Sequence, residues 1–229
     1  MNFDNYKFHP SGVEALNTKP KSKKAEFSET AITYLTKIWA EETKQVKEEI
    51  ENKYCAKGTT VESESIELLN EYSGTNYEKN ELQINNDFFI GTPDILTYPV
   101  IDIKSSWNYL TFLKAISKPT NKVYIMQVNC YADIMDIDKG ELCYALVNTP
   151  ESIVNRELNS LNYKGYTEKK IQDEEERIIL LHNFDRFKIE ERLYFRAIAR
   201  NDELLDNTKK EIIKARKWLN NYDPHKILI

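Results

Sequence analysis

The stretch LQINNDFFIGTPDILTYPVIDIK, residues 82–104, decides the fold of this chain. Its apolar residues form short runs rich in β-branched and aromatic side chains, which predict two or three strands of a sheet. Turn-forming residues interrupt these runs at 85–87, 91–93 and 98–99. Asp94 follows the second turn, at the start of a short strand that can return beside the next one.

Helical patterns flank this stretch on both sides. Upstream, apolar residues recur at helical spacing from Ser28, and a second helix starts near Thr59 or Thr60 and stops at Gly74. Downstream, the expected elements are a short helix at 110–115, a long helix at about 121–135, a strand at 142–147, a helix from Pro150, and helices over about 167–222 with a break near Asn183. This order predicts an α/β domain with a small mixed central sheet, flanking helices and a helical C-terminal part.

Composition narrows the class of protein. The chain has 229 residues, only 6 glycines and no Gly/Ser-rich or Pro-rich linker, which predicts one domain over 1–229. Its longest uncharged run is the ten residues 123–132, whereas a membrane-spanning helix needs roughly 20. A net charge of −5 argues against a protein that coats nucleic acid by charge alone, but not against an enzyme with local nucleic-acid contacts. The first residues lack an apolar leader, so the expected location is the cytoplasm of a bacterial or phage-infected cell.

The cysteines and histidines do not have the spacing of a soft metal site. Cys55, Cys130 and Cys143 are far apart, and so are the three histidines. A zinc or haem site is therefore not expected. Any metal ligands must be oxygen atoms, which favours Mg²⁺, Mn²⁺ or Ca²⁺.

Asp94, Asp102 and Lys104 indicate the chemistry of the chain. Alternate side chains of a strand share a face, so Asp102 and Lys104 point the same way while Ile101 and Ile103 point into the core. Two carboxylates and an ammonium then converge at one edge of the sheet. Carboxylates held together repel each other unless a cation lies between them, and oxygen ligands suit Mg²⁺. A lysine beside them can hold or deprotonate an attacking water, or neutralise charge on a phosphate.

Asp94 followed by Asp102-x-Lys104 resembles the signature of the PD-(D/E)xK nucleases. The element Gly58-x-x-x-Glu62 is similar to the helix start found in phage λ-exonuclease-like and YqaJ-like viral recombinase nucleases.

Two other segments resemble the same family. Gln127 and Tyr131 lie four residues apart on the helix after the hairpin, so they share one helix face. The segments 8–13 and 18–23 resemble the N-terminal region of YqaJ-like proteins.

The resemblance implies a restriction-endonuclease-like core over 58–148, an irregular basic segment at 1–27 and a mostly helical region at 150–229. It implies an exodeoxyribonuclease that degrades duplex DNA from an end, 5′→3′, in phage or prophage recombination, with a single-strand-annealing protein as partner. One or two Mg²⁺ or Mn²⁺ ions would be held by Glu62, Asp94, Asp102 and the Ile103 carbonyl. Lys104 and Gln127 would orient the attacking water and complete the catalytic set.

The residues expected to contact DNA are His9, Ser11, Lys19, Lys21, Lys23, Lys24, Ser105, Trp107 and Tyr131. His9 stands where relatives tend to carry an arginine, and the lysines are a candidate substitute for binding a 5′ phosphate.

Each of these residues also has a simpler explanation. Glu62 with Thr59 has the spacing of a helix capping box. Asp94 fits a turn, and Asp102 with Lys104 fits a solvated strand face. Gln127 fits an exposed helix position, and Tyr131 fits an ordinary core.

Other functions on this fold stay open at this point. A restriction-type or structure-specific endonuclease would use the same residues, and a non-catalytic DNA-binding protein could keep the fold. A ring, a dimer and a monomer are all compatible with the sequence.

Overall fold

The computed structural model describes residues 2–47, 53–161 and 164–226, with the backbone alone for 53–56. Its helices are α1 Glu29–Lys44, α2 Lys53–Thr60, α3 Glu62–Ser73, α4 Tyr109–Ser117, α5 Lys122–Met135, α6 Glu151–Leu161, α7 Glu168–His182 and α8 Asp202–Asn221. Its strands are β1 Ile84–Asn85, β2 Ile90–Gly91, β3 Val100–Ser105, β4 Lys139–Ala145 and β5 Leu193–Ala199, and two 3-10 turns are η1 Val13–Asn17 and η2 Ile189–Glu191.

The central sheet is small and mixed, as the sequence predicts. Strand order is β3-β4-β5, with β3 parallel to β4 and β4 antiparallel to β5. Helices α4 and α5 make the crossover between the two parallel strands. A bridge between Ile95 and Ile101 folds the preceding segment back onto β3, which brings Asp94 beside this strand.

Strand β5 corrects the expectation that the chain is helical from about 167 to 222. Helix α7 ends at His182, and Leu193–Ala199 pairs with β4 along its whole length. This segment, LYFRAIA, is rich in strand-forming residues but has only one fully buried side chain, Leu193. Its place in the sheet depends on backbone pairing with β4, a long-range contact that the local pattern does not reveal. The sheet is thus completed by a strand from outside the predicted 58–148 core.

Polar side chains begin three of the helices, and the sequence predicts two of these starts, Ser28 and Asn121. The Ser28 hydroxyl accepts a hydrogen bond from the Ala31 amide at the start of α1, at 3.0 Å. Asn121 accepts from the Val123 amide at the start of α5, and Asn108 forms a capping box with Thr111 at the start of α4. Gly74, in the left-handed conformation, ends α3.

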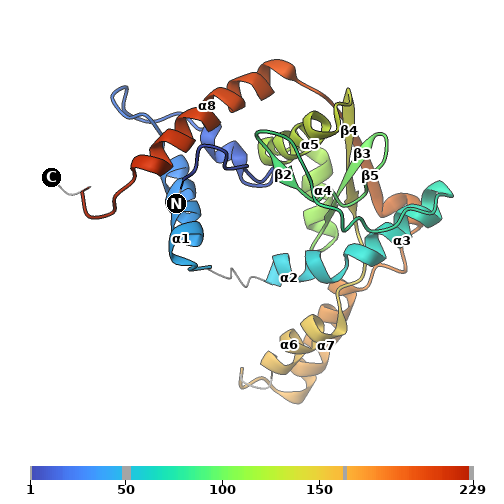
Figure 1. Ribbon diagram of the computed structural model, residues 1–229. Helices are drawn as coiled ribbons and strands as arrows, with labels where there is room; N and C mark the ends of the chain where they lie inside the picture. The colour runs from blue at the N-terminus through green and yellow to red at the C-terminus, as the bar shows by residue number, and fades with distance from the viewer. Residues whose placement is uncertain (1, 48–52, 162–163, 227–229) are drawn as a thin grey trace.

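Different helices cover the two faces of the sheet (Figure 1). On one face, Ile101 and Ile103 of β3 pack in a cluster with α3 residues such as Ile66. On the other face, Leu142 and Tyr144 of β4 pack with Phe112 of α4. Asp102 and Lys104 point toward this second face, where α5 also lies.

Helix α5 also supports a second layer of helices. Met126 and Cys130 belong to the core cluster formed by the N-terminal segment, α1 and α8. Gly140 on β4 allows α5 to approach the sheet closely, because an added Cβ would lie 2.4 Å from Val128 Cγ1. Figure 1 shows α8 crossing over the N-terminal segment, and α6 and α7 projecting as a hairpin away from the sheet. Among the residues with a described structure, no helix is long and apolar enough to cross a membrane.

Candidate active site

A cavity of about 740 Å³ opens at the β3 edge of the sheet. Helix α3, strand β3, helix α5 and the N-terminal segment all contribute to its wall. Its lining residues are Ser11, Gly58, Thr59, Glu62, Asp94, Ile103, Lys104, Ser105, Val123, Tyr124 and Gln127. Four of the five predicted catalytic residues are therefore in the wall, and the fifth, Asp102, contacts one of them directly.

Asp102 is buried beneath the cavity, and among the described residues its compensating positive charge comes from the Lys104 ammonium. Its side chain is 1% exposed, and Lys104 Nζ lies 2.6 Å from its Oδ2 atom. This contact is an ion pair, because neither carboxylate oxygen has a hydrogen-bond partner among the described residues. Burial raises the pKa of Asp102, while the Lys104 ammonium opposes that rise. One ammonium does not replace the hydrogen bonds that both buried oxygens lack, which is costly unless a further cation or a proton joins the carboxylate.

Asp94 lies next to this carboxylate. Its Oδ2 atom accepts a hydrogen bond of 2.6 Å from the Ile103 amide, which fixes the side chain against β3. Burial and the negative charge of Asp102 raise the pKa of Asp94 to about 7, although Lys104 and the Ile103 amide act in the opposite direction. The two aspartates therefore repel each other as the sequence predicts.

Lys104 supplies the positive charge of the site. Burial alone would lower its pKa, but the Asp102 and Asp94 carboxylates raise it on balance. Its Nζ atom also lies 5.1 Å from the centre of the Tyr124 ring. The side chain is thus a protonated ammonium held between carboxylates and an aromatic face.

Glu62 is the first residue of α3, at the mouth of the cavity. The N-cap of α3 is Val61, and no described side chain caps this helix by a hydrogen bond. Thr59 lies in the preceding helix α2, so the predicted capping box is not how α3 begins. The Glu62 carboxylate instead forms an ion pair with Lys79, at 3.1 Å.

The side-chain positions match a metal site only in part. Within the described ranges, no group of three His, Cys, Asp or Glu side chains lies close enough to hold a metal ion. Asp94 and Asp102 provide two adjacent oxygen donors, and Ile103 lies in the cavity wall beside them. The third predicted carboxylate, Glu62, is engaged by Lys79. The unpartnered Asp102 oxygens nevertheless fit a hard cation.

Gln127 and Tyr131 share a face of α5, but only Gln127 lines the cavity. The Tyr131 hydroxyl donates to the Thr92 carbonyl at 3.2 Å, and its ring packs within 3.0 Å of the position of a Cβ on Gly91. Tyr131 therefore holds the 91–93 turn against α5, and with it the position of Asp94.

Two of the predicted DNA contacts, Ser11 and Ser105, also line the cavity. His9 is exposed but is not part of the wall, and neither are the four lysines at 19–24. These lysines lie on an exposed loop that projects away from the sheet (Figure 1). Trp107 packs edge-on against the His182 ring, with centroids 5.1 Å apart.

Sequence reasoning missed two residues of the site. Tyr124 lies one turn before Gln127, so helical spacing could have identified it. Lys79 lies in the irregular segment after α3, where no periodic pattern indicates its partner.

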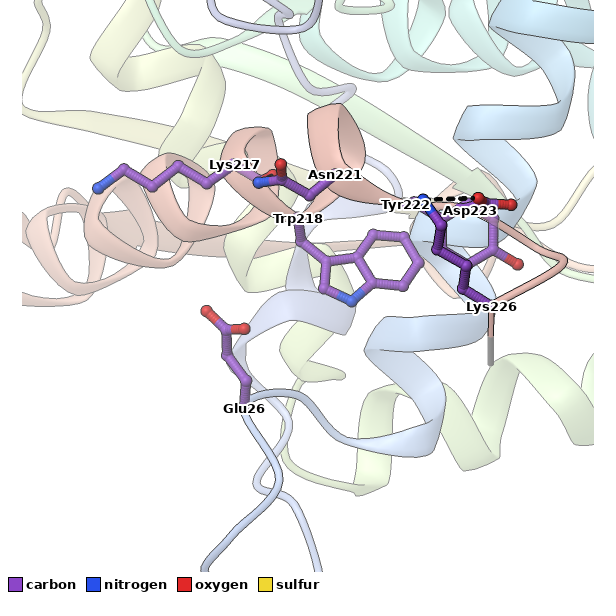
Figure 2. Close-up of a pocket in the computed structure, with 7 residues that line it drawn as sticks. All are labelled: Glu26, Lys217, Trp218, Asn221, Tyr222, Asp223 and Lys226. Carbon is purple, nitrogen blue, oxygen red and sulfur yellow. Dashed lines mark hydrogen bonds and ion pairs between the residues drawn. The ribbon is translucent and has the colours of Figure 1, made fainter. Parts of the chain in front are cut away.

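A separate hollow of about 420 Å³ lies at the end of α8 (Figure 2). Its most prominent feature is the stacked pair of Trp218 and Tyr222, with ring centroids 4.4 Å apart. No residue of the predicted catalytic or DNA-binding set lines this hollow.

Comparison with known proteins identifies solved structures that have the same fold. No family model and no curated protein matches the sequence. Among solved structures, a phage-related exonuclease from Haemophilus somnus 129PT superposes with a TM-score of 0.74, covering 94% of each chain at 23% identity. The chain has the fold of this exonuclease. The resemblance to λ-exonuclease-like nucleases is thereby confirmed for the fold.

The alkaline exonuclease LHK-Exo from Laribacter hongkongensis has the exonuclease fold as well. It gives a TM-score of 0.62 at 16% identity, covering 95% of this chain and 89% of that one. Its complex with dAMP gives the same TM-score at 17% identity, covering 93% and 88%. The matches extend well beyond residues 8–148, so the exonuclease fold includes most of the C-terminal region.

Proposed function

We propose that this chain is a metal-dependent exodeoxyribonuclease that hydrolyses duplex DNA from an end. The observation that carries the proposal is the state of the buried Asp102 carboxylate. It lies next to Asp94 and Lys104 at an open cavity, and its oxygens accept no hydrogen bond from the described residues. Such an arrangement lowers the stability of the fold, and a function as a site for a cation and a phosphate would account for it. The structural likeness to two exonucleases supports the same conclusion.

Asp94, Asp102 and the Ile103 carbonyl would hold the Mg²⁺ or Mn²⁺. Glu62 would join them after leaving Lys79, which its position at the cavity mouth allows. When bound, the cation would relieve the repulsion between the aspartates and stabilise charge on the phosphate.

The protein side chains have separate tasks in the reaction. The Lys104 ammonium lies beside both aspartates and contributes positive charge next to the phosphate; its raised pKa makes it a poor base. The Gln127 amide lines the same cavity and orients the attacking water. Ser11, on the N-terminal segment, also lines the cavity and contacts the DNA there.

The finer details of the proposal come from the family resemblance. Degradation runs 5′→3′ in phage or prophage recombination, and a single-strand-annealing protein receives the exposed strand. Composition supports two further parts of the proposal: the chain, 1–229, forms one domain, and its place of action is the cytoplasm.

Metal dependence is the first test of the proposed function. Cleavage of linear duplex DNA should stop in EDTA and return with Mg²⁺ or Mn²⁺. Asp94→Asn and Asp102→Asn should each lower metal affinity, measured by calorimetry, together with the rate. Asp206→Asn, on the exposed face of α8, is a matched control and should change neither quantity. Cleavage that persists in EDTA would contradict the proposal.

Two further variants separate the roles within the site. Lys104→Ala should lower the rate by roughly 10²–10⁴-fold with little loss of metal affinity. Glu62→Gln should weaken metal binding if Glu62 moves from Lys79 to the cation. Unchanged metal affinity in Glu62→Gln would restrict the ligand set to Asp94, Asp102 and Ile103.

A further inference from the structure

A groove of about 430 Å³ continues the catalytic cavity past Lys104. The cavity and the groove share Lys104, Ser105 and Tyr124 in their walls. The other residues of the groove come from the loop after β3, from α4, from the turn between α4 and α5, and from β4. They are Ser106, Trp107, Thr111, Lys114, Ala115, Lys118, Pro119, Asn121 and Tyr144.

The wall of the groove combines positive charge with polar and aromatic side chains. It contains three lysines and no aspartate or glutamate, in a chain with 37 acidic residues and a net charge of −5. Lys114 and Lys118 are exposed, and within the described ranges neither forms an ion pair with a carboxylate. Hydroxyl and amide groups of Ser105, Ser106, Thr111 and Asn121 surround them. Such a wall attracts an anion that carries several phosphate oxygens.

The backbone that carries these lysines is held rigidly. Arg196 on β5 donates hydrogen bonds to the carbonyls of Ile116 and Lys118, at 2.6 and 2.7 Å. It also donates to the Thr120 hydroxyl at 2.8 Å, which ties the α4–α5 turn to the sheet. The capping box of Asn108 and Thr111 fixes the other end of α4. A prearranged pair of cations loses less entropy on binding a ligand than a pair on a mobile loop.

We infer that this groove binds the backbone phosphates of the DNA strand that passes through the active site. The inference deepens the proposed function, on which it rests. A strand whose scissile phosphate lies at Asp94 and Lys104 would continue through the shared wall into the groove. Lys114 and Lys118 would then pair with the next phosphates along the strand. These two contacts would hold DNA close to the reactive centre of an acidic chain, whose cavity wall itself contains one described lysine, Lys104.

The test compares Lys114→Gln/Lys118→Gln with Lys122→Gln, a matched control. Lys122 is an exposed lysine at the start of α5 that lines neither the groove nor the cavity. Binding of an end-labelled duplex with a short single-stranded end is followed by fluorescence anisotropy in EDTA, which prevents cleavage. The double variant should bind about tenfold or more weakly. The slope of its salt dependence should flatten by about 0.7 for each single-strand phosphate that no longer pairs with a lysine. Lys122→Gln should bind like the wild type.

Neutral methylphosphonate linkages at the two phosphates beside the scissile position give a second arm. They should weaken binding to the wild type by the same factor and have little further effect on the double variant. Equal losses of affinity in Lys122→Gln and in the double variant would overturn the inference in favour of a diffuse charge effect. Unchanged DNA binding in the double variant, with weaker inhibition by a free 5′-mononucleotide, would make the groove a product site and would also overturn it.

The two levels of the proposal can fail separately. A wild-type chain that binds DNA through Lys114 and Lys118 but never cleaves it with Mg²⁺ would refute the proposed function while supporting the groove. A chain that cleaves DNA, with normal binding by the double variant, would refute the groove alone.

Discussion

At the scale of single residues, the repulsion between the two aspartates makes the stability of the metal-free protein depend on pH. Asp94 has a pKa raised to about 7 by burial and by Asp102, against 3.8 for an unperturbed aspartate. The unfolded chain therefore releases this proton at lower pH than the folded chain. The stability that protonated Asp94 contributes is complete below about pH 4 and is lost as the pH rises through about 7.

Asp94→Asn should therefore stabilise the metal-free protein at pH 8. The asparagine carbonyl can still accept the hydrogen bond from the Ile103 amide, while the buried charge disappears. The expected gain is about 1–3 kcal/mol, and it should vanish near pH 4. Urea unfolding in EDTA across this pH range measures it. A variant that is equally destabilised at both pH values would show that Asp94 is not repelled in the folded state. Added Mg²⁺ should stabilise the wild type but not the variant.

Lys57 is a buried residue whose pKa is lowered, so its effect on stability changes with pH in the opposite direction from that of Asp94. Its side chain is 1% exposed, and its Nζ donates to the carbonyls of Trp107 at 3.1 Å and Val147 at 2.9 Å. Burial lowers the pKa of Lys57 to about 7. A neutral amine retains two N–H donors, which suffice for the two carbonyls. Lys57 thereby ties helix α2, which contributes to the cavity wall, to the loop after β3.

Protonation of Lys57 gives a testable pH dependence with the opposite sign from Asp94. Between pH 7 and about 10.5 the unfolded chain holds the extra proton on Lys57, so the contribution of Lys57 to stability should rise with pH, by at most about 1.4 kcal/mol per unit. Lys57→Met should remove this rise, whatever its effect on absolute stability. Lys210→Met, an exposed position on α8, is the control and should keep the rise. The same pH slope in both variants would mean that Lys57 is charged in the folded protein.

Sequence reasoning succeeded for residues governed by local geometry. Alternation along a strand placed Asp102 and Lys104 together, and the turn at 91–93 placed Asp94 beside them. It failed for Lys57, because its partner Val147 is far away in the chain. It failed for Lys79, because this residue lies in a segment without a periodic pattern.

At the scale of elements, the close contact of α5 with the sheet positions Gln127 over β3. Gly140 makes this contact possible, since a Cβ there would lie 2.4 Å from Val128 Cγ1 and 2.9 Å from Val100 Cγ1. Gly140→Ala should cost about 1–3 kcal/mol, measured by urea unfolding, because both neighbours are buried branched side chains. Adding Val128→Ala should recover part of the loss. Full stability in Gly140→Ala alone would contradict this packing.

Gly58 in α2 provides the contrasting case. An added Cβ at Gly58 meets no atom of the described residues within 4 Å, and the residue lies inside a helix. Gly58→Ala should stabilise the protein by about 0.5–1 kcal/mol through helix propensity. A loss of stability in thermal unfolding would show that this glycine is required by the fold.

Most elements were predictable because each is specified by its own pattern, a cap or a turn. Ser28, Asn121 and Gly74 mark helix ends that the structure confirms. Strand β5 was not predictable, because its half-exposed residues lie between two helical patterns and its identity depends on pairing with β4. The lysines at 19–24 lie on a projecting loop and not in the cavity wall, and their expected contact with DNA stays a prediction (Figure 1).

At the scale of the whole molecule, the acidic cavity and the cationic side chains of the groove meet at Lys104. Lys104 lies in their shared wall, and Lys114 and Lys118 follow along the groove. Under the proposed function, the acidic remainder of the chain should weaken nonspecific binding to duplex DNA, and productive binding should depend on a strand end that can enter the cavity. An endonuclease built around the same residues would not need such an end.

The most direct test is a time course with Mg²⁺ on two substrates, linear duplex DNA and a covalently closed circle of the same sequence. Wild-type protein should degrade the linear duplex to mononucleotides and leave the circle intact, and Asp102→Asn should degrade neither. Cleavage of the closed circle as fast as the linear duplex would contradict an enzyme that acts from DNA ends.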